Sequence, residues 1–138
     1  MPGVLPARTL TVTIDAPPER VYAFASDGAN LPRWAAGLAT SVEREGDAWR
    51  VASPAGPVTV RFAPNNPFGV LDHVVRLASG EEVGVPMRVV PNGGGSEVLF
   101  TLFRTPTMDD ARFAADARLV EADLRALKAV LEGAPRGA

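Results

Sequence analysis

The chain has 138 residues, a formal net charge of −2, one histidine and no cysteine. Without cysteine there are no disulfides, thiolate nucleophiles or cysteine zinc clusters, and one histidine cannot build a histidine-rich metal site. No run of lysine or arginine is present to neutralise a row of phosphates, so the chain is not expected to bind nucleic acid. We therefore expect neither a metal nor another cofactor.

The length suits a single domain, which we take as residues 1–138 with a core over about residues 9–132 and short flexible ends. The N-terminal sequence MPGVLPARTL has no basic stretch followed by an apolar core, so a signal peptide is not expected. No apolar run approaches the ~18–20 residues of a membrane span. These features predict a cytoplasmic protein without a membrane span.

The N-terminal third predicts one strand and two short helices. Residues Thr9–Asp15 alternate between apolar and threonine side chains, as in a strand with one buried face. Pro17 and Pro18 follow, and proline suits the first turn of a helix. The sequence GAN should end this helix, and NLPRWAAGL predicts a second one that begins at Asn30.

Six further strands are predicted between turn sequences such as EGD, PAGP, PNNPFG and PNGGGS. The short connections favour antiparallel hairpins. The expected strands are Thr40–Glu45, Ala48–Ser53, Val58–Ala63, Val70–Ala78, Glu82–Val90 and Glu97–Arg104. In the last strand both faces carry apolar residues, and we expect Val98, Phe100 and Leu102 to point inward and Leu99 and Phe103 outward.

Asp72 and His73 are adjacent, which raises the question of a proton relay. Side chains alternate between the faces of a strand, so Asp72 points away from the imidazole of its neighbour. His73 shares its face with Leu71, Val75 and Leu77, and this apolar face should be buried. The relay is therefore excluded, and a lone inward-facing histidine remains.

The register of the next hairpin suggests a structural role for Asp72. If Ser79–Glu81 forms a three-residue loop, Val75 lies opposite Val85 and His73 lies opposite Met87. On the other face, Asp72 then meets Arg88, and opposite charges across strands stabilise a sheet.

The C-terminal segment predicts a long helix over Met108–Glu132, with Thr107 as its N-cap and Asp110 in its first turn. Its apolar residues recur at spacings of three and four. They are Phe113, Ala117, Val120, Leu124, Leu127 and Leu131. At ~1.5 Å per residue such a helix is roughly 37 Å long, so it must lie along most of the sheet.

The order of elements, together with two local sequences, resembles the START/polyketide-cyclase (SRPBCC) superfamily, in its bacterial polyketide cyclase/dehydrase and lipid-transport branch. The sequence IDAPPERVYAFASDGANLPRW is similar to the opening of that family, and FTLFRTPTMDDARFAADARLVEADLRALKAVLE is similar to its closing strand and helix. The resemblance implies the α+β helix-grip fold, a bent antiparallel sheet of about seven strands around a long C-terminal helix, with an internal cavity.

The resemblance implies two functions. The first is the binding of a small hydrophobic molecule, such as a lipid, polyketide or aromatic metabolite, in that cavity. The alternative is a polyketide cyclase or dehydratase in which His73 and Arg104 are the polar catalytic groups. The expected ligand-binding residues share an inward-facing or gating position. They are Tyr22, Trp34, Trp49, Val60, Phe62, Leu71, Val75, Val85, Met87, Phe100, Phe113, Ala117 and Val120.

Several of these residues have a purely structural alternative. Trp34 and Trp49 could be core residues, and Tyr22 could be exposed on the first helix. Arg104 could form an ion pair with Asp109 or Asp110, and His73 could bond a backbone carbonyl. Leu99 and Phe103, on the outer face, lead to the separate hypothesis of a homodimer.

Overall fold

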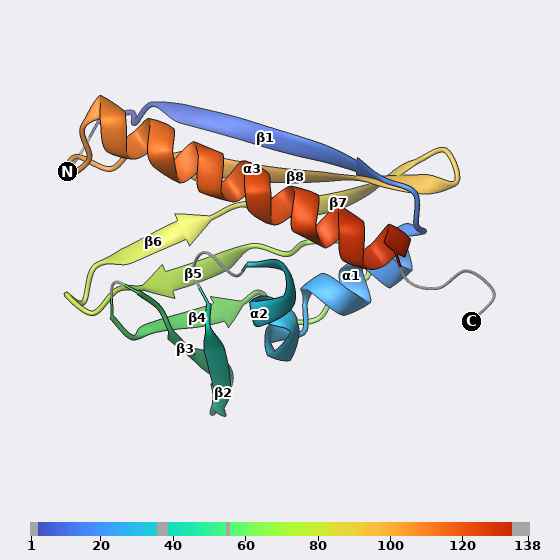
Figure 1. Cartoon of the computed structure of the whole chain (residues 1–138), viewed down its shortest axis with the longest axis horizontal. Helices are drawn as coiled ribbons and strands as arrows, with labels where there is room; N and C mark the ends of the chain where they lie inside the picture. The colour runs from blue at the N-terminus through green and yellow to red at the C-terminus, as the bar shows by residue number, and fades with distance from the viewer. Residues whose placement is uncertain (1–2, 36–38, 55, 134–138) are drawn as a thin grey trace.

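The computed structural model describes residues 3–35, 39–54 and 56–133 (Figure 1). It contains eight strands, three α-helices and one short 3₁₀ helix within these residues. In chain order they are β1 (Ala7–Ile14), α1 (Pro18–Ala25), η1 (Gly28–Asn30), α2 (Leu31–Trp34), β2 (Ser41–Glu45), β3 (Ala48–Ala52), β4 (Val58–Phe62), β5 (His73–Arg76), β6 (Glu82–Val85), β7 (Met87–Asn92), β8 (Gly95–Phe103) and α3 (Asp110–Gly133).

The strands form two antiparallel sheets. One has the order β1-β8-β7, and the other has the order β2-β3-β4-β5-β6. β1 pairs with β8 along its whole length, so the first strand of the chain is held by the last. The expected fold class, α+β with a long C-terminal helix on a bent antiparallel sheet, is confirmed.

Pro86 divides the segment that we expected to be one strand, Glu82–Val90. Proline has no backbone N–H and interrupts a ladder of hydrogen bonds. The chain therefore leaves its partner β5 after Val85 and continues as β7, which pairs with β8. The carbonyl of Pro86 still accepts a hydrogen bond from the Thr101 backbone N–H at 2.9 Å, and this bond ties the junction to β8.

β5 is shorter than the expected Val70–Ala78, because the residues before it pair with β7 and not with β6. The Leu71 N–H donates to the Met87 carbonyl at 2.8 Å, and the Val89 N–H donates to the Gly69 carbonyl at 3.0 Å. One segment therefore pairs with both sheets where they diverge.

The expected register of the β5–β6 hairpin is wrong by two residues. Val75 lies opposite Val83, and His73 lies opposite Val85. Gly80 has a φ of 91°, and the Leu77 N–H donates to the Glu81 carbonyl, so the loop is Ala78–Gly80. Glycine at the last loop position supplies the positive φ that such a loop requires. A shift by two residues preserves the faces, so His73 still points inward.

The N-cap of α3 is also corrected. The Asp109 carboxylate accepts a hydrogen bond from the Arg112 N–H at 2.8 Å, so Asp109 and not Thr107 caps the helix. The helix buries the expected stripe from Ala117 to Leu131 and packs mainly on β1, α2 and β8.

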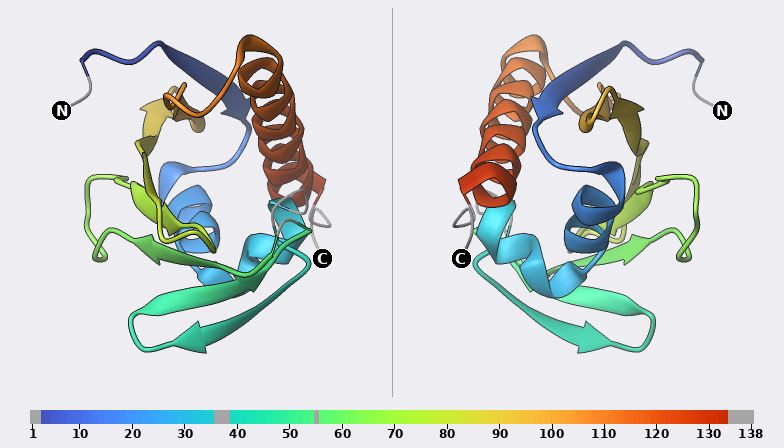
Figure 2. Two further views of the ribbon diagram at one scale, coloured as in Figure 1. Left: turned by 90° about the vertical axis from the view of Figure 1, so that its left-hand side faces the viewer. Right: turned by 90° about the vertical axis from the view of Figure 1, so that its right-hand side faces the viewer.

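Viewed down the long axis of the molecule, the elements form a ring (Figure 2). α3 lies on one side, β1 and β8 lie next to it, and the five-stranded sheet curves round to α2, which contacts α3. α1 covers one end of this ring. Trp49 packs so closely on the backbone of Gly28 that a Cβ there would lie 2.3 Å from the indole nitrogen, so a side chain at position 28 is excluded.

Gly69 provides a test of the sheet junction. Its φ is 73°, and an added Cβ would lie 2.2 Å from the Val89 carbonyl oxygen. Gly69→Ala should therefore lower the free energy of unfolding by well over ~1 kcal/mol, because strain and a backbone clash act together. Gly80→Ala is the control, since Gly80 also has a positive φ but no atom within 4 Å of the added Cβ. If urea unfolding showed that both variants lose the same free energy of unfolding, the proposed clash at the sheet junction would be contradicted.

Candidate functional site

The pairing of strands sets two rows of side chains on the inner face of the five-stranded sheet. One row runs Val85–His73–Phe62 across β6, β5 and β4, and the other runs across all five strands. The second row consists of Val83, Val75, Val60, Trp49 and Arg44. From the first sheet, Phe100 faces the same interior, because its ring lies 6.0 Å from that of His73.

His73 lies between two phenylalanine rings. Its ring centroid is 5.2 Å from that of Phe62 and is tilted by 46°, and its contact with Phe100 is edge-on at 66°. These separations and angles are favourable for aromatic pairs. The imidazole is therefore fixed by apolar neighbours on both sides.

Nδ1 of His73 lies 3.0 Å from the carbonyl oxygen of Leu71. A carbonyl oxygen can only accept, so Nδ1 carries the proton and Nε2 is an acceptor in the neutral ring. The structural alternative expected from the sequence, a bond to a backbone carbonyl, is thus present for one nitrogen.

Nε2 of His73 forms no hydrogen bond with any residue of the described chain. In those same residues, Trp34 Nε1 is the only buried side-chain nitrogen or oxygen without a hydrogen-bond partner. A completely buried Nε2 without a partner would be a second atom of this kind. Since Trp34 Nε1 is the only one in that part of the chain, Nε2 of His73 is not fully enclosed by protein atoms. Nε2 of His73 therefore keeps some exposure to solvent, beside the aromatic neighbours of the ring.

Burial lowers the pKa of His73, because the charged ring would lose its hydration. The bond to Leu71 and the nearby Asp72 charge oppose this shift but do not cancel it. The ring is therefore neutral at pH 7, with the tautomer that the Leu71 carbonyl selects.

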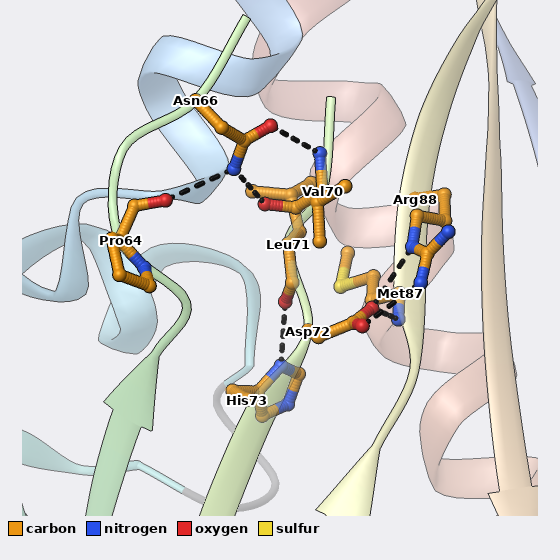
Figure 3. A network of polar contacts seen from close by, with 8 residues as sticks. All are labelled: Pro64, Asn66, Val70, Leu71, Asp72, His73, Met87 and Arg88. Carbon is orange, nitrogen blue, oxygen red and sulfur yellow. Dashed lines mark hydrogen bonds and ion pairs between the residues drawn. The ribbon is translucent and has the colours of Figure 1, made fainter. Parts of the chain in front are cut away.

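Asp72 joins the two sheets on the opposite face (Figure 3). Its Oδ1 accepts the Met87 N–H at 2.9 Å and Arg88 Nε at 3.0 Å, and its Oδ2 accepts Arg88 Nη2 at 2.9 Å. The hydrogen bond from Arg88 is the main reason that the pKa of Asp72 is lowered. The predicted Asp72–Arg88 pair is confirmed, but it is diagonal in the register, and the bond to Met87 was not foreseen.

The loop before β5 is organised by Asn66 (Figure 3). Its amide donates to the carbonyls of Pro64 and Val70, and its oxygen accepts the N–H groups of Phe68 and Val70. The Tyr22 hydroxyl accepts the Asn66 N–H at 3.0 Å. Tyr22 thus stabilises this loop and lines a separate cleft of about 260 Å³ beside α1.

Arg104 has the structural partner that the sequence suggested. Its guanidinium forms an ion pair with Asp110 and donates to the Met108 carbonyl at 3.1 Å. The side chain therefore links the end of β8 to the start of α3 through its Nε and Nη1 donors.

The other predicted ligand-binding residues fall into two groups. The first group is buried and belongs to the core, and the second group is half-buried. The buried group is Trp34, Val60, Leu71, Val85, Met87, Ala117 and Val120. The half-buried group is Trp49, Phe62, Val75, Phe100 and Phe113.

Three half-buried inward residues, Leu77, Val83 and Leu102, were not in the predicted set. We call the positions Phe62, His73, Val75, Leu77, Val83, Phe100 and Leu102 the open inner face. The contact of the Arg44 guanidinium with the Trp49 ring, at 5.5 Å, was also missed. It follows from the β2–β3 register, which places the two residues opposite each other.

The outer face bears on the homodimer hypothesis. Leu99 and Phe103 are only half-buried, so neither is a prominent apolar projection. Phe103 does line a shallow, mainly apolar depression of about 430 Å³ with Val74, Gly84 and Pro86, and this depression also borders His73 and Phe62.

In residues 3–35, 39–54 and 56–133, no helix is long and apolar enough to cross a membrane. Over the same part of the chain, no group of three or more histidine, cysteine, aspartate or glutamate side chains is arranged to hold a metal ion.

Comparison with known proteins identifies the family. The model of the family "Polyketide cyclase / dehydrase and lipid transport" matches residues 8–132. The chain belongs to this family. Comparison with curated proteins gives no match.

Several solved structures have the same fold at low sequence identity. The Aha1 dimer from Colwellia psychrerythraea is 16% identical with a TM-score of 0.74, over 93% of this chain and 97% of that one. A START superfamily protein from Mycobacterium smegmatis is 14% identical with a TM-score of 0.69, over 94% and 99% of the two chains. The di-domain ARO/CYC protein BexL, from the BE-7585A biosynthetic pathway, is 20% identical with a TM-score of 0.70, over 95% of this chain and 48% of that one.

For Asp72 we predict a structural role. Asp72→Ala should lower the free energy of unfolding by about 1–2 kcal/mol, since it removes hydrogen bonds that each contribute ~0.5–1.5 kcal/mol. Asp72→Asn should lower it less, because the amide oxygen can still accept the Met87 N–H. Urea unfolding measures both. A loss of ligand binding in Asp72→Asn with an unchanged thermal midpoint would instead assign Asp72 to the functional site.

His73 should make stability depend on pH. Its folded pKa is lowered, so below the unfolded value of ~6.5 the unfolded chain binds more protons than the folded one. Stability is therefore full above pH ~6.5 and falls as the pH drops towards the folded value, by at most ~1.4 kcal/mol per pH unit.

His73→Phe provides the control. Because the chain has no other histidine, the variant should lose most of this dependence between pH 7.5 and 5.5 in urea unfolding. If the free energy of unfolding changed with pH by the same amount in the wild type and in His73→Phe, the imidazole would not be held neutral.

Proposed function

We propose that the protein binds a small hydrophobic molecule between the open inner face and the N-terminal half of α3. The observation that carries the proposal is the half-exposure of apolar side chains that point into the fold. In a completely filled core, inward-facing valine, leucine and phenylalanine are closed to solvent.

The contrast within the sheet supports this reading. Val60, Leu71 and Met87 are each about 1% exposed. Val75, Val83 and Leu77 point to the same side of the sheet and remain half-buried. The interior is therefore filled near α1 and α2 and accessible near the β5–β6 hairpin, and a bound apolar molecule would cover those residues.

The composition of the open inner face fits a ligand site. Such sites are mainly apolar and contain a few polar atoms that set the orientation of the ligand. Here six side chains are apolar, and Nε2 of His73 is the accessible polar atom. The tilted rings of Phe62 and Phe100 favour a planar or aromatic ligand.

The comparisons support the same class of function. The family description joins polyketide cyclase and dehydrase activity with lipid transport, and BexL is described as an ARO/CYC protein of a biosynthetic pathway. Lipids, polyketides and aromatic metabolites are thus the candidate ligands.

A cyclase or dehydratase is the second candidate, because His73 presents an unprotonated nitrogen that could accept a proton from a bound substrate. Such a reaction also needs a donor for a developing enolate oxygen. Arg104 is the candidate donor, although its Nη1 is paired with Asp110 and its Nε with the Met108 carbonyl. An enzyme of this kind should lose turnover in His73→Phe while it still binds its substrate.

A cytoplasmic location and a homodimer remain predictions from the sequence. The Aha1 structure is described as a dimer, and the depression beside Phe103 is a candidate contact. Light scattering that shows a monomer at high concentration would rule out the dimer.

Native mass spectrometry of the purified protein should show a co-purifying small molecule that solvent denaturation releases. Val75→Phe should remove this adduct and weaken the binding of 2-naphthol at least about tenfold (~1.4 kcal/mol), because the larger ring occupies the open inner face. Val74→Phe is the matched control, since Val74 is the next residue on the strand and is 39% exposed on the outer face. Equal binding by both variants would place the ligand elsewhere.

A further inference from the structure

We propose that the ligand is an uncharged, mainly apolar molecule that carries a hydroxyl group, and that this hydroxyl donates a hydrogen bond to Nε2 of His73. The inference rests on the proposed function and specifies its ligand class. It follows from the fixed tautomer of one imidazole and from the residues that surround it.

The tautomer is fixed by a rigid backbone. The Leu71 carbonyl that accepts from Nδ1 belongs to a residue whose N–H is bonded to Met87. The next residue, Asp72, is bonded to the Met87 N–H and to Arg88. The carbonyl cannot turn away without breaking this junction, so the proton stays on Nδ1 and Nε2 stays an acceptor.

The neighbours of His73 cannot satisfy Nε2. In its row, the side chains on either side are Phe62 and Val85, and Phe100 lies across the interior. None of these side chains has a hydrogen-bond donor. An acceptor that a ligand covers without supplying a donor costs about 1–3 kcal/mol.

This cost discriminates between ligands. A hydroxyl group satisfies Nε2, whereas a ketone or ether oxygen would place its lone pairs against the lone pair of the ring. A purely apolar ligand would cover Nε2 and leave it unsatisfied. The site therefore selects a donor by penalising the alternatives.

The placement of charges favours an uncharged ligand. Asp72 points to the other face and is paired with Arg88. Arg104 is paired with Asp110. Two further arginines at the edges of the interior, Arg44 across from Trp49 and Arg8 across from Leu102, are exposed to solvent. An anionic group would be held at these edge positions and not beside His73.

Binding of four probes of similar shape tests the proposal by calorimetry at neutral pH. The probes are 2-naphthol, 2-methoxynaphthalene, naphthalene and 2-naphthoate. We expect 2-naphthol to bind at least about tenfold more tightly than each of the others, and His73→Phe to remove that preference. Val75→Ala is the control, because it changes apolar contact alone and should shift all the affinities by a similar factor.

NMR of protein labelled with ¹⁵N in histidine gives an independent readout. The chain has one histidine, so its two ring nitrogens give one pair of signals. Nδ1 should have the shift of a protonated nitrogen. Addition of 2-naphthol should move the Nε2 signal in the direction of an accepted hydrogen bond, and 2-methoxynaphthalene should not.

The outcomes separate this inference from the function on which it rests. Similar affinities for 2-naphthol, its methyl ether and naphthalene would overturn the donor requirement and leave hydrophobic binding in place. Tighter binding of 2-naphthoate, unaffected by His73→Phe, would assign selection to the edge arginines. Binding of none of the probes, with no co-purifying molecule, would overturn both proposals.

Discussion

The geometry of this fold depends on the hydrogen bonds that the Asp72 carboxylate accepts from the Met87 N–H and from the Arg88 guanidinium. The strand that follows β5 is interrupted at Pro86, which has no N–H, and the chain passes there from one sheet to the other. The Met87 N–H just beyond the break would otherwise have no strand partner. A carboxylate from the neighbouring segment accepts it and binds the adjacent guanidinium at 2.9 Å. The Asp72 side chain thus supplies the hydrogen-bond acceptors for both donors at the junction between the two sheets.

The same junction creates the candidate site. Because Asp72 points outward to this contact, His73 must point inward, and the Leu71 carbonyl is held where Nδ1 can donate to it. The divergence of the sheets also places Phe100 of one sheet against His73 of the other. A structural ion pair on one face therefore determines the protonation pattern of a polar atom on the other face.

Most of the fold could be predicted from the sequence because its signals are local. Alternation in Thr9–Asp15 and the helical spacing from Phe113 to Leu131 each depend on a single segment. The inward direction of His73 was predicted correctly even though its cross-strand partner was not, since a shift by two residues leaves the faces unchanged. Gly80 and Pro86 carry the local signals for the loop and for the strand break, because glycine tolerates a positive φ and proline has no backbone N–H.

The site was less predictable, because accessibility depends on how distant elements pack. Val60 and Val75 are both inward-facing valines on neighbouring strands, yet one is closed and the other half-buried. No local pattern distinguishes them, since the difference arises from where α1, α2 and α3 cover the sheet. For Trp34, the sequence leaves open both a core position and a gating position at the cavity. In the structure its side chain is only 3% exposed, which places it in the core.

The pairing of β1 with β8 has a consequence for synthesis of the chain. On the ribosome, β1 emerges before the other strands of the described residues, but β8, with which its backbone pairs, emerges after all of them. The second to sixth strands can meanwhile close as local hairpins, for which the loss of chain entropy is small. Throughout translation β1 therefore presents unpaired N–H and C=O groups beside an apolar face, the kind of edge to which other chains add. The opposite face of β1 stays polar during this time, because it carries the alternating threonines Thr9, Thr11 and Thr13.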